Sequence, residues 1–351
     1  MSNLDTPASY DSFDPSRIRD AIRQSPDWCE VAYAAGRSLA LPDAFRRAGR
    51  VVFAGMGHAA IAGDVVRALY ARESPLHLSV WRDYDLPAFA SGPDTLVIAS
   101  SASGADDEPL SALDEAVRRQ CSALVLCPGG DMALRASQAG APRYWPAFTT
   151  PAHQTGLWQI FLLLGILSEL WLIPDPGAAV SEAVSVMREA ARVIGPDSPA
   201  VRNPSKRLAG QFIGRLPIIV GAGILAPVAA YWKLQLNHIA KTAAVCDEMP
   251  NANHGSTLGY ERPDAVWQKS IVIALRGACD DPRVAARHDL TTTLMLEAGL
   301  NQDTARARGS SPLAQACSLA CFGDWTAYYT AIMSEIDPAP APFVYHAWNQ
   351  T

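Results

Sequence analysis

The chain has 351 residues, 49% of them hydrophobic and 18% charged, which is enough for two α/β domains with separate cores. Its formal net charge of -6 disfavours nucleic acid or an anionic membrane as the main partner. The polar, acidic start at residues 1–14 does not resemble a secretion signal. The longest apolar stretch, 157–173, is interrupted by Gln159, Ser168 and Glu169, and it indicates a buried helix rather than a membrane span.

The cysteine usage points to an intracellular protein. The seven cysteines are odd in number and contain no CxxC pair. Cys317 and Cys321 lie one helical turn apart, but no histidine or second cysteine pair completes a metal site. We therefore expect reduced, structural thiols and a cytoplasmic location.

Strand-like and helix-like segments alternate in the first half of the chain. The expected strands are 51–54, 77–81, 95–99 and 123–126, and the expected helices are 59–70, 110–120 and 154–170. This alternation is typical of a parallel sheet with helices on both faces. The Pro- and Gly-containing segment 174–177 then breaks the pattern and starts a connecting helix at 178–193.

The second half repeats the pattern. The expected strands are 217–220 and 270–275, and the expected helices are 225–243, 282–298 and a closing helix at 314–336. The sequence therefore predicts two tandem, doubly wound parallel-sheet domains. Residues 1–173 form the first, with a leading helix, and residues 174–351 form the second, with a C-terminal closing helix and a tail.

Each half contains a GxGxxA turn between a strand and a helix, beginning at Gly55 and at Gly221. Such a turn lets a ligand approach the backbone and offers free N–H groups to an anion. It also fits a dinucleotide site, with Asp83 as the acidic residue, or tight strand–helix packing alone. The repetition of the turn favours two copies of one α/β unit.

Six segments, in chain order, resemble the bifunctional phosphoglucose/phosphomannose isomerases. They are 55–64 (family GMGGSAIAGD), 82–87, 101–108 (family SYSGNTEE), 232–237 (family WKxQLN), 250–254 (family PELNH) and 322–340, with its IDPAP end. The resemblance implies two sugar-isomerase (SIS) domains and a homodimer with the active site at the domain and subunit junction. It also implies a sugar or sugar-phosphate substrate and no metal or organic cofactor. In that chemistry a glutamate moves a proton between C1 and C2 through an enediol.

The resemblance implies a phosphate cradle of hydroxyls and backbone amides, for which Gly57, Ser101, Ser103 and Gly104 are the matching positions. The family's loop threonine is replaced by Asp106. A carboxylate about 4 Å from a phosphate repels it by roughly 4 kcal/mol per charge pair at an effective dielectric constant of 20. The expected phosphate site is therefore altered.

Three interpretations of this change stay open. A protonated His58, next to the Ala59 that replaces the family's serine, would take over as the anion partner. Alternatively, Asp106 turns to solvent as part of an acid-rich helix start with Asp107 and Glu108. The third interpretation is a ligand that presents an amino or hydroxyl group to Asp106 instead of a phosphate.

The catalytic positions are also altered. The family glutamate falls on His238, and an imidazole with a pKa near 6.5 can shuttle protons at neutral pH. His254 matches the loop histidine that the resemblance links to ring opening and to the neighbouring subunit. His153, Gln154 and Thr155 stand where the family has an arginine segment, and they line the site or cap the following helix.

We therefore predict a cofactor-free isomerase acting on a sugar or sugar phosphate, with His238 as the base and His254 assisting ring opening. One alternative is a non-catalytic sugar-binding protein on the same scaffold. Another is an Amadori-type rearrangement of an aminated sugar.

Overall fold

The computed structural model describes residues 4–148, 150–151, 154–259 and 263–339. They form two compact units, residues 25–181 and residues 1–24 with 182–351. The boundaries fall inside two long helices, α1 (Ile18–Ser38) and α6 (Gly177–Ile194). Short 3-10 helices occur at η1 (Pro7–Ser12) and η2 (Asp43–Arg47).

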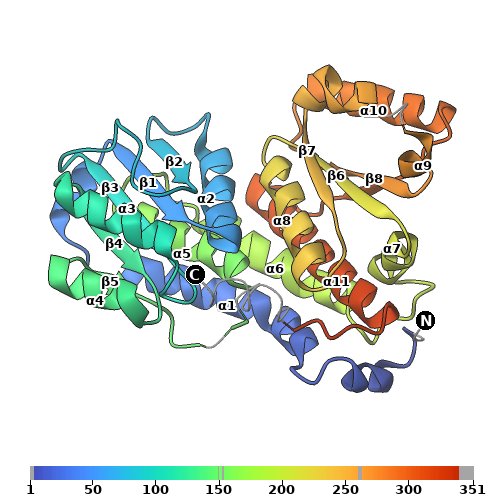
Figure 1. Ribbon diagram of the computed structural model, residues 1–351, viewed down its shortest axis with the longest axis horizontal. Helices are drawn as coiled ribbons and strands as arrows, with labels where there is room; N and C mark the ends of the chain where they lie inside the picture. Colours follow the sequence, from blue (N-terminus) through green and yellow to red (C-terminus); the bar gives the residue numbers. More distant parts are fainter. Residues whose placement is uncertain (1–3, 149, 152–153, 260–262, 340–351) are drawn as a thin grey trace. The chain divides into compact units, whose positions relative to one another are not determined.

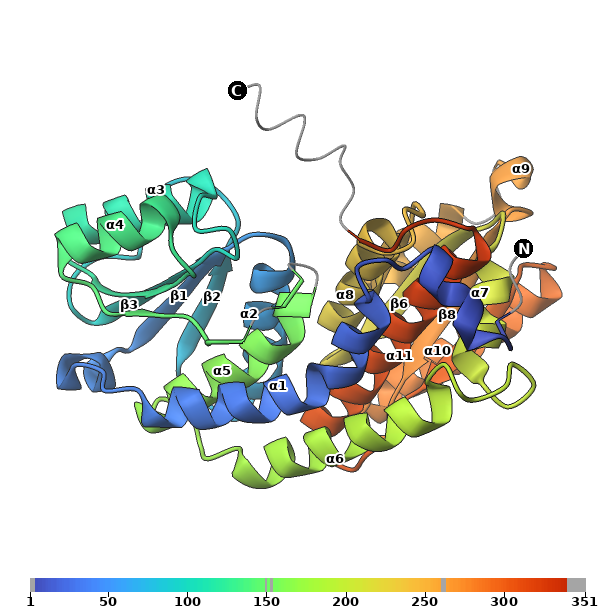
Figure 2. The ribbon, with the colours of Figure 1, turned by 90° about the horizontal axis from the view of Figure 1, so that it is seen from below.

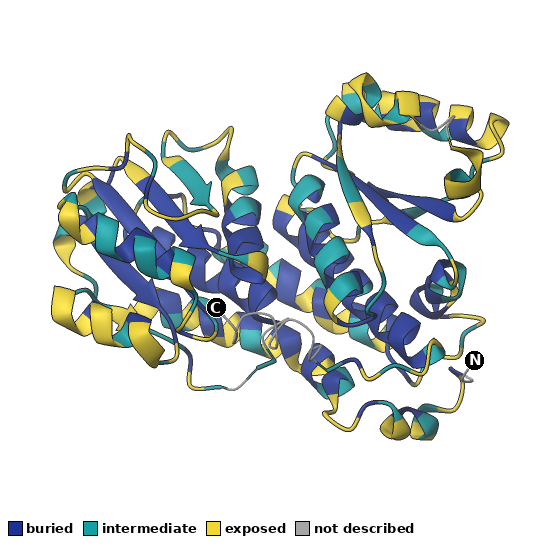
Figure 3. Cartoon of the chain, in the orientation of Figure 1, coloured by how far each residue is buried: buried dark blue, intermediate teal, exposed yellow. Residues whose placement is uncertain are grey.

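The unit 25–181 contains a five-stranded parallel sheet in the order β2-β1-β3-β4-β5 (Figure 1). The strands are β1 (Arg50–Gly55), β2 (His77–Trp81), β3 (Thr95–Ser100), β4 (Ser122–Leu126) and β5 (Arg143–Tyr144). Every residue of β3 is buried, as expected for a central strand covered on both faces (Figure 3).

Helices cover both faces of this sheet (Figure 2). They are α2 (Gly57–Tyr70), α3 (Asp107–Arg118), α4 (Gly130–Ala139) and α5 (Thr155–Glu169). The helices α3 and α4 pack on one face through small side chains such as Ala112 and Ala136. The helix α2 packs on the other face, where Gly63 leaves room for the Phe53 ring.

The unit of residues 1–24 and 182–351 contains a four-stranded parallel sheet in the order β7-β6-β8-β9. Its strands are β6 (Leu216–Ala222), β7 (Val245–Met249), β8 (Ser270–Arg276) and β9 (Gln302–Arg306). Its helices are α7 (Pro204–Phe212), α8 (Leu225–His238), α9 (Asp264–Trp267), α10 (Pro282–Glu297) and α11 (Pro312–Met333), with 3-10 turns η4 (Asn251–His254) and η5 (Ser256–Gly259).

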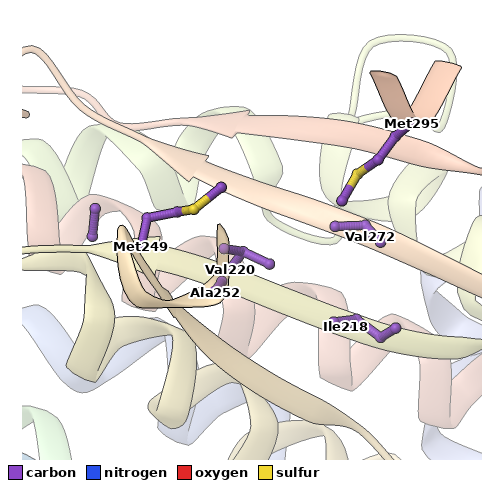
Figure 4. Packing of buried hydrophobic residues seen from close by; sticks show 7 residues of the cluster. Ile218, Val220, Met249, Ala252, Val272 and Met295 are labelled. Carbon is purple, nitrogen blue, oxygen red and sulfur yellow. The ribbon is translucent and has the colours of Figure 1, made fainter. Parts of the chain in front are cut away.

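The two faces of this second sheet carry different helices. Figure 1 shows α8 and α11 on one side of the strands and α10 on the other. On the α10 side, Met295 of α10 and Ala252 of η4 share a buried cluster with Val220 and Val272 of the sheet (Figure 4). The segment that carries His254 therefore lies on the face opposite α8.

The N-terminal segment packs against this second unit. The buried Tyr10 ring lies 6.1 Å from the Tyr328 ring and 6.4 Å from the Tyr329 ring, measured between centroids. The Lys206 ammonium donates to the carbonyl oxygen of Leu4 at 2.5 Å. The division expected between residues 173 and 174 stays a prediction, whereas these contacts join residues 4–24 to the C-terminal half.

Most predicted elements occur, and the predicted doubly wound parallel fold is confirmed. The helix expected at 225–243 instead ends at His238, because Lys241 takes a left-handed backbone conformation with φ 51°. The sequence prediction gave no bounds for the leading helix α1 and missed α4, α7, α9, β5, β7 and β9. The edge strands β7 and β9 read VCDEM and QDTAR, and such polar runs lack the apolar pattern of a buried strand. Within the described residues, no helix is long and apolar enough to cross a membrane.

Candidate functional site

The topology places a candidate site at the carboxyl ends of β1 and β3. The chain runs from β1 to β2 in one direction and from β3 to β4 in the other, so these two strands flank the switch point of the sheet. Ligands of doubly wound folds bind at this point. Gly55 and Ser100 are register partners there, which brings the loops after the two strands together.

The first of these loops starts α2. Gly57 has φ +48°, and a Cβ at this residue would meet no atom within 4 Å. His58 follows in the first turn of α2 and is buried, with 6% of its surface exposed. Because α2 and α3 both begin at this edge, the positive ends of their dipoles favour a negative charge there.

The second loop itself contains a negatively charged group, the carboxylate of Asp106. The Ser101 hydroxyl donates to Asp106 Oδ2 at 2.6 Å, and the Ser103 hydroxyl donates to Asp106 Oδ1 at 3.1 Å. The Gly104 and Ala105 amides in turn donate to the oxygens of Ser101 at 2.8 Å and Ser103 at 3.1 Å. Asp106 stands at the N-cap position of α3, but its side chain makes no capping hydrogen bond. The partly exposed Asp106 carboxylate is thus directed to the serines and does not cap α3, whereas the neighbouring Asp107 is exposed.

Gly104 is required by close packing in this loop. It has φ +76°, and a Cβ there would lie 2.0 Å from the carbonyl oxygen of Gly129. Its own carbonyl accepts a hydrogen bond from the Met132 amide at 3.1 Å. The backbone at the start of α4 therefore packs directly against the backbone of the serine loop and holds this loop in place. No side chain fits between them.

The segment before α5 is described only in part, and His153 lies outside the described residues. Gln154 occupies the N-cap of α5 without a side-chain capping bond. It is fully buried, and neither of its amide atoms has a partner within the described part of the chain. Thr155, the first residue of α5, is buried as well. The capping interpretation of Gln154 is therefore wrong.

His238 is the last residue of α8, in the second unit. The residue is exposed, yet burial of the imidazole and the nearby Lys241 ammonium lower the pKa of His238 below its usual value. Lys241 is held there by a hydrogen bond from Nζ to the His238 carbonyl oxygen at 2.7 Å. Both influences favour the neutral form of the ring.

His254 and His238 do not converge within one chain. His254 is exposed at the end of η4, and the Asn253 side chain before it donates to Thr291 of α10 at 2.8 Å. His238 ends α8 on the opposite face of the sheet. Within one chain, the elements that carry the two histidines therefore lie on opposite faces of the sheet.

The sequence prediction gave no role to a buried polar cluster that fixes α8. Asp324 of α11 is fully buried, and its Oδ1 accepts hydrogen bonds from the Tyr231 hydroxyl at 2.8 Å and from the Gln235 amide. Gln235 lies one turn before His238. An acidic residue within an otherwise apolar helix is a signal that reveals such a cluster, because carboxylates are almost never fully buried without partners.

The seven cysteines form no disulfide among the described residues. Likewise, no group of three or more His, Cys, Asp or Glu side chains in the described ranges is arranged to hold a metal ion.

Known proteins resemble this chain over nearly its full length. Residues 201–347 match the family model of the bacterial phospho-glucose isomerase C-terminal SIS domain. A bifunctional phosphoglucose/phosphomannose isomerase of Caldicellulosiruptor bescii is 28% identical over 326 residues, covering 92% of this chain and 95% of that protein. A D-glucosamine-6-phosphate 4-epimerase of Sulfolobus acidocaldarius is 24% identical over 211 residues, covering 60% of this chain and 63% of that protein.

Solved structures with a similar fold also occur among sugar phosphate isomerase-like proteins. The structure of a glucose-6-phosphate isomerase-like protein from Thermus thermophilus has a TM-score of 0.65 and 18% identity, covering 98% of this chain and 100% of that one. Two parallel sheets with glycine turns after the first strand of each thus define a double SIS-domain protein. By sequence the chain is similar to the bifunctional phosphoglucose/phosphomannose isomerases, and its residues 201–347 match the SIS domain of the bacterial phospho-glucose isomerases.

Proposed function

We propose that this protein is a cofactor-free isomerase that moves a proton between adjacent carbons of a sugar or sugar phosphate. The observation that carries the proposal is the state of His238. It matches the family's catalytic glutamate, and the burial and positive charge that lower its pKa favour the neutral imidazole at pH 7. A neutral imidazole is a competent general base at that pH.

In the proposed mechanism, His238 takes a proton from the carbon next to the carbonyl group. The resulting enediolate receives that proton back from the imidazolium on the former carbonyl carbon, while the hydroxyl proton of the adjacent carbon passes to the former carbonyl oxygen, which completes the aldose–ketose conversion. The imidazolium forms at the C-terminus of α8, where the negative end of the helix dipole favours a cation. His254 of a second copy assists ring opening, so the functional unit is a homodimer.

Proton exchange with solvent tests the reaction. In D2O, NMR of glucose 6-phosphate, mannose 6-phosphate, fructose 6-phosphate, glucose and glucosamine reports deuterium entering C1 or C2. We expect exchange with at least one of these compounds and its loss in His238→Ala. The matched control is His77→Ala, because His77 is exposed on β2 in the other unit. An active enzyme in which His238→Ala keeps the wild-type rate would refute the role of His238.

Complementation tests the shared site. His238→Ala and His254→Ala are inactive alone if both histidines act. In a mixed heterodimer, one of the two sites recovers both histidines only if they come from different copies. A statistical mixture then recovers about a quarter of the wild-type exchange. No recovery from two variants that both fold and dimerise contradicts the shared site.

Two alternatives make different predictions. The placement of His238 and His254 on opposite faces of the sheet favours a non-catalytic sugar-binding protein, which binds sugars but shows no exchange with any compound. The name of the Sulfolobus relative, an aminosugar phosphate epimerase, favours a rearrangement of an aminated sugar. In that case exchange occurs with glucosamine alone.

A further inference from the structure

The loop between β3 and α3 is built like an anion cradle. Hydroxyl groups, backbone amides and a helix N-terminus gather at a switch point, and this set of donors commonly binds a phosphate. In this chain both serine hydroxyls and the Gly104 and Ala105 amides are engaged within the loop itself. The two serine hydroxyls donate to Asp106, and the Gly104 and Ala105 amides donate to the serine oxygens.

The carboxylate of Asp106 therefore accepts the hydrogen bonds that a bound anion would accept in such a loop. Each of its oxygens accepts one serine hydroxyl, at 2.6 Å for Oδ2 and 3.1 Å for Oδ1. An ionised carboxylate offers about four lone-pair directions, so it retains room for further donors. What the loop presents outward is thus an acceptor with a negative charge, the reverse of a phosphate cradle.

We propose that Asp106 reverses the preference of this loop, so that the substrate presents a hydrogen-bond donor, either an ammonium or a hydroxyl group, where a phosphate would otherwise bind. The inference deepens the proposed function, because it concerns the substrate class of the same family site. A phosphate would have to displace the carboxylate from both serines and would also meet its charge. A donor group adds to the existing network without breaking any bond in it.

Binding to the full-length protein tests this inference without requiring turnover. Isothermal titration compares glucose 6-phosphate, glucosamine and glucose on the wild type, on Asp106→Thr and on Asp106→Ser. Either substitution replaces the carboxylate with a hydroxyl and leaves both serine hydroxyls available. We expect the affinity for glucose 6-phosphate to rise at least about tenfold, because a repulsive charge is removed and two donors are freed.

Asp107→Thr is the matched control. Asp107 is the exposed first residue of α3, next to Asp106 in sequence, and its replacement changes the net charge equally. We expect no comparable gain from it. Thermal unfolding shows whether each variant is folded. If Asp106→Thr does not fold, Asp106→Ser is used in its place. The glucosamine and glucose titrations show whether the preferred donor is cationic or neutral.

The proposal is overturned if neither Asp106 variant gains affinity for glucose 6-phosphate, or if Asp107→Thr gains as much. A failure of this inference can be distinguished from a failure of the proposed isomerase function. Proton exchange on a phosphorylated sugar that the wild type binds more tightly than glucosamine and glucose would support an isomerase and refute the inference. If Asp106→Thr gains affinity for glucose 6-phosphate but no compound undergoes proton exchange, the inference is supported and the isomerase is refuted.

Discussion

The hydroxyl of Tyr231 donates to Oδ1 of Asp324 at 2.8 Å in the fully buried interface between α8 and α11. Within the described residues, Oδ2 of the same carboxyl group has no partner. Beside this pair, Trp232 donates to the Leu319 carbonyl oxygen at 2.7 Å, and a Cβ at Gly323 would lie 2.5 Å from its indole nitrogen. These contacts fix the helix that ends in His238.

Asp324 is expected to make stability depend on pH. Burial raises the pKa of Asp324 to about 7, although the hydrogen bonds from Gln235 and Tyr231 lower it. In the unfolded chain the value is near 3.9, so the folded state binds the extra proton, and stability is lost as pH rises from about 4 through about 7. Relative to Asp324→Asn, the wild type should lose about 4 kcal/mol over this range.

Urea unfolding of both proteins at several pH values measures this loss. The Asn side chain keeps an oxygen for Tyr231 and Gln235 but does not ionise. Parallel stability curves for the two proteins would show that Asp324 does not titrate between folded and unfolded states.

Gly104→Ala is expected to be strongly destabilising. The added Cβ would lie 2.0 Å from the Gly129 carbonyl oxygen, and the backbone has φ +76°. We expect a loss of at least about 3 kcal/mol, because strain and a backbone clash combine. Gly92→Ala is the matched control: its φ is +73°, but a Cβ there meets no atom within 4 Å. It should lose only about 1–2 kcal/mol. Equal losses in urea unfolding would mean that the packing of the serine loop against α4 contributes nothing.

Lys206 is expected to anchor the N-terminal segment to the C-terminal unit. Its ammonium is buried and donates to the carbonyl oxygens of Leu4 at 2.5 Å and Pro196 at 2.9 Å. Lys206→Met leaves both carbonyls without this donor, and we expect a loss of about 2–4 kcal/mol. Lys269→Met, at an exposed lysine of the same unit, should change stability by less than about 0.5 kcal/mol. Hydrogen exchange at residues 4–12 should rise in the Lys206 variant alone. Unchanged protection there would contradict the anchoring role.

The pH profile of proton exchange is expected to report on His238. Burial and Lys241 lower its pKa, so the basic form persists at lower pH and the midpoint of the rising limb should lie below 6.5. Lys241→Met removes the neighbouring positive charge and should move the midpoint upward. Lys233→Met, on the same helix, should leave it in place, because Lys233 does not contribute to the shift. A midpoint that does not respond to Lys241 would exclude His238 as the titrating base.

The local features of this protein were readable from its sequence. The apolar strands, the glycine turns and the serines of the β3–α3 loop occur where the pattern predicted them, because strand periodicity and turn chemistry are set by neighbouring residues. The sequence also identified Asp106 as the residue that conflicts with a phosphate. The edge strands β7 and β9 were missed, because their polar residues gain strand structure only by pairing with β6 and β8.

Only the tertiary structure determined which groups Asp106 and Asp324 contact and where His238 lies. The sequence left open whether Asp106 faces solvent or a ligand, and the loop held against Gly129 directs its carboxylate to the serines. His254 was linked to the neighbouring subunit only through the resemblance, and the right-handed crossovers that put α8 and α10 on opposite faces of the sheet separate it from His238 within a chain. The burial of Asp324 likewise arises from the packing of two helices that are distant in sequence. Such relationships depend on long-range contacts, which the pattern of a single segment does not encode.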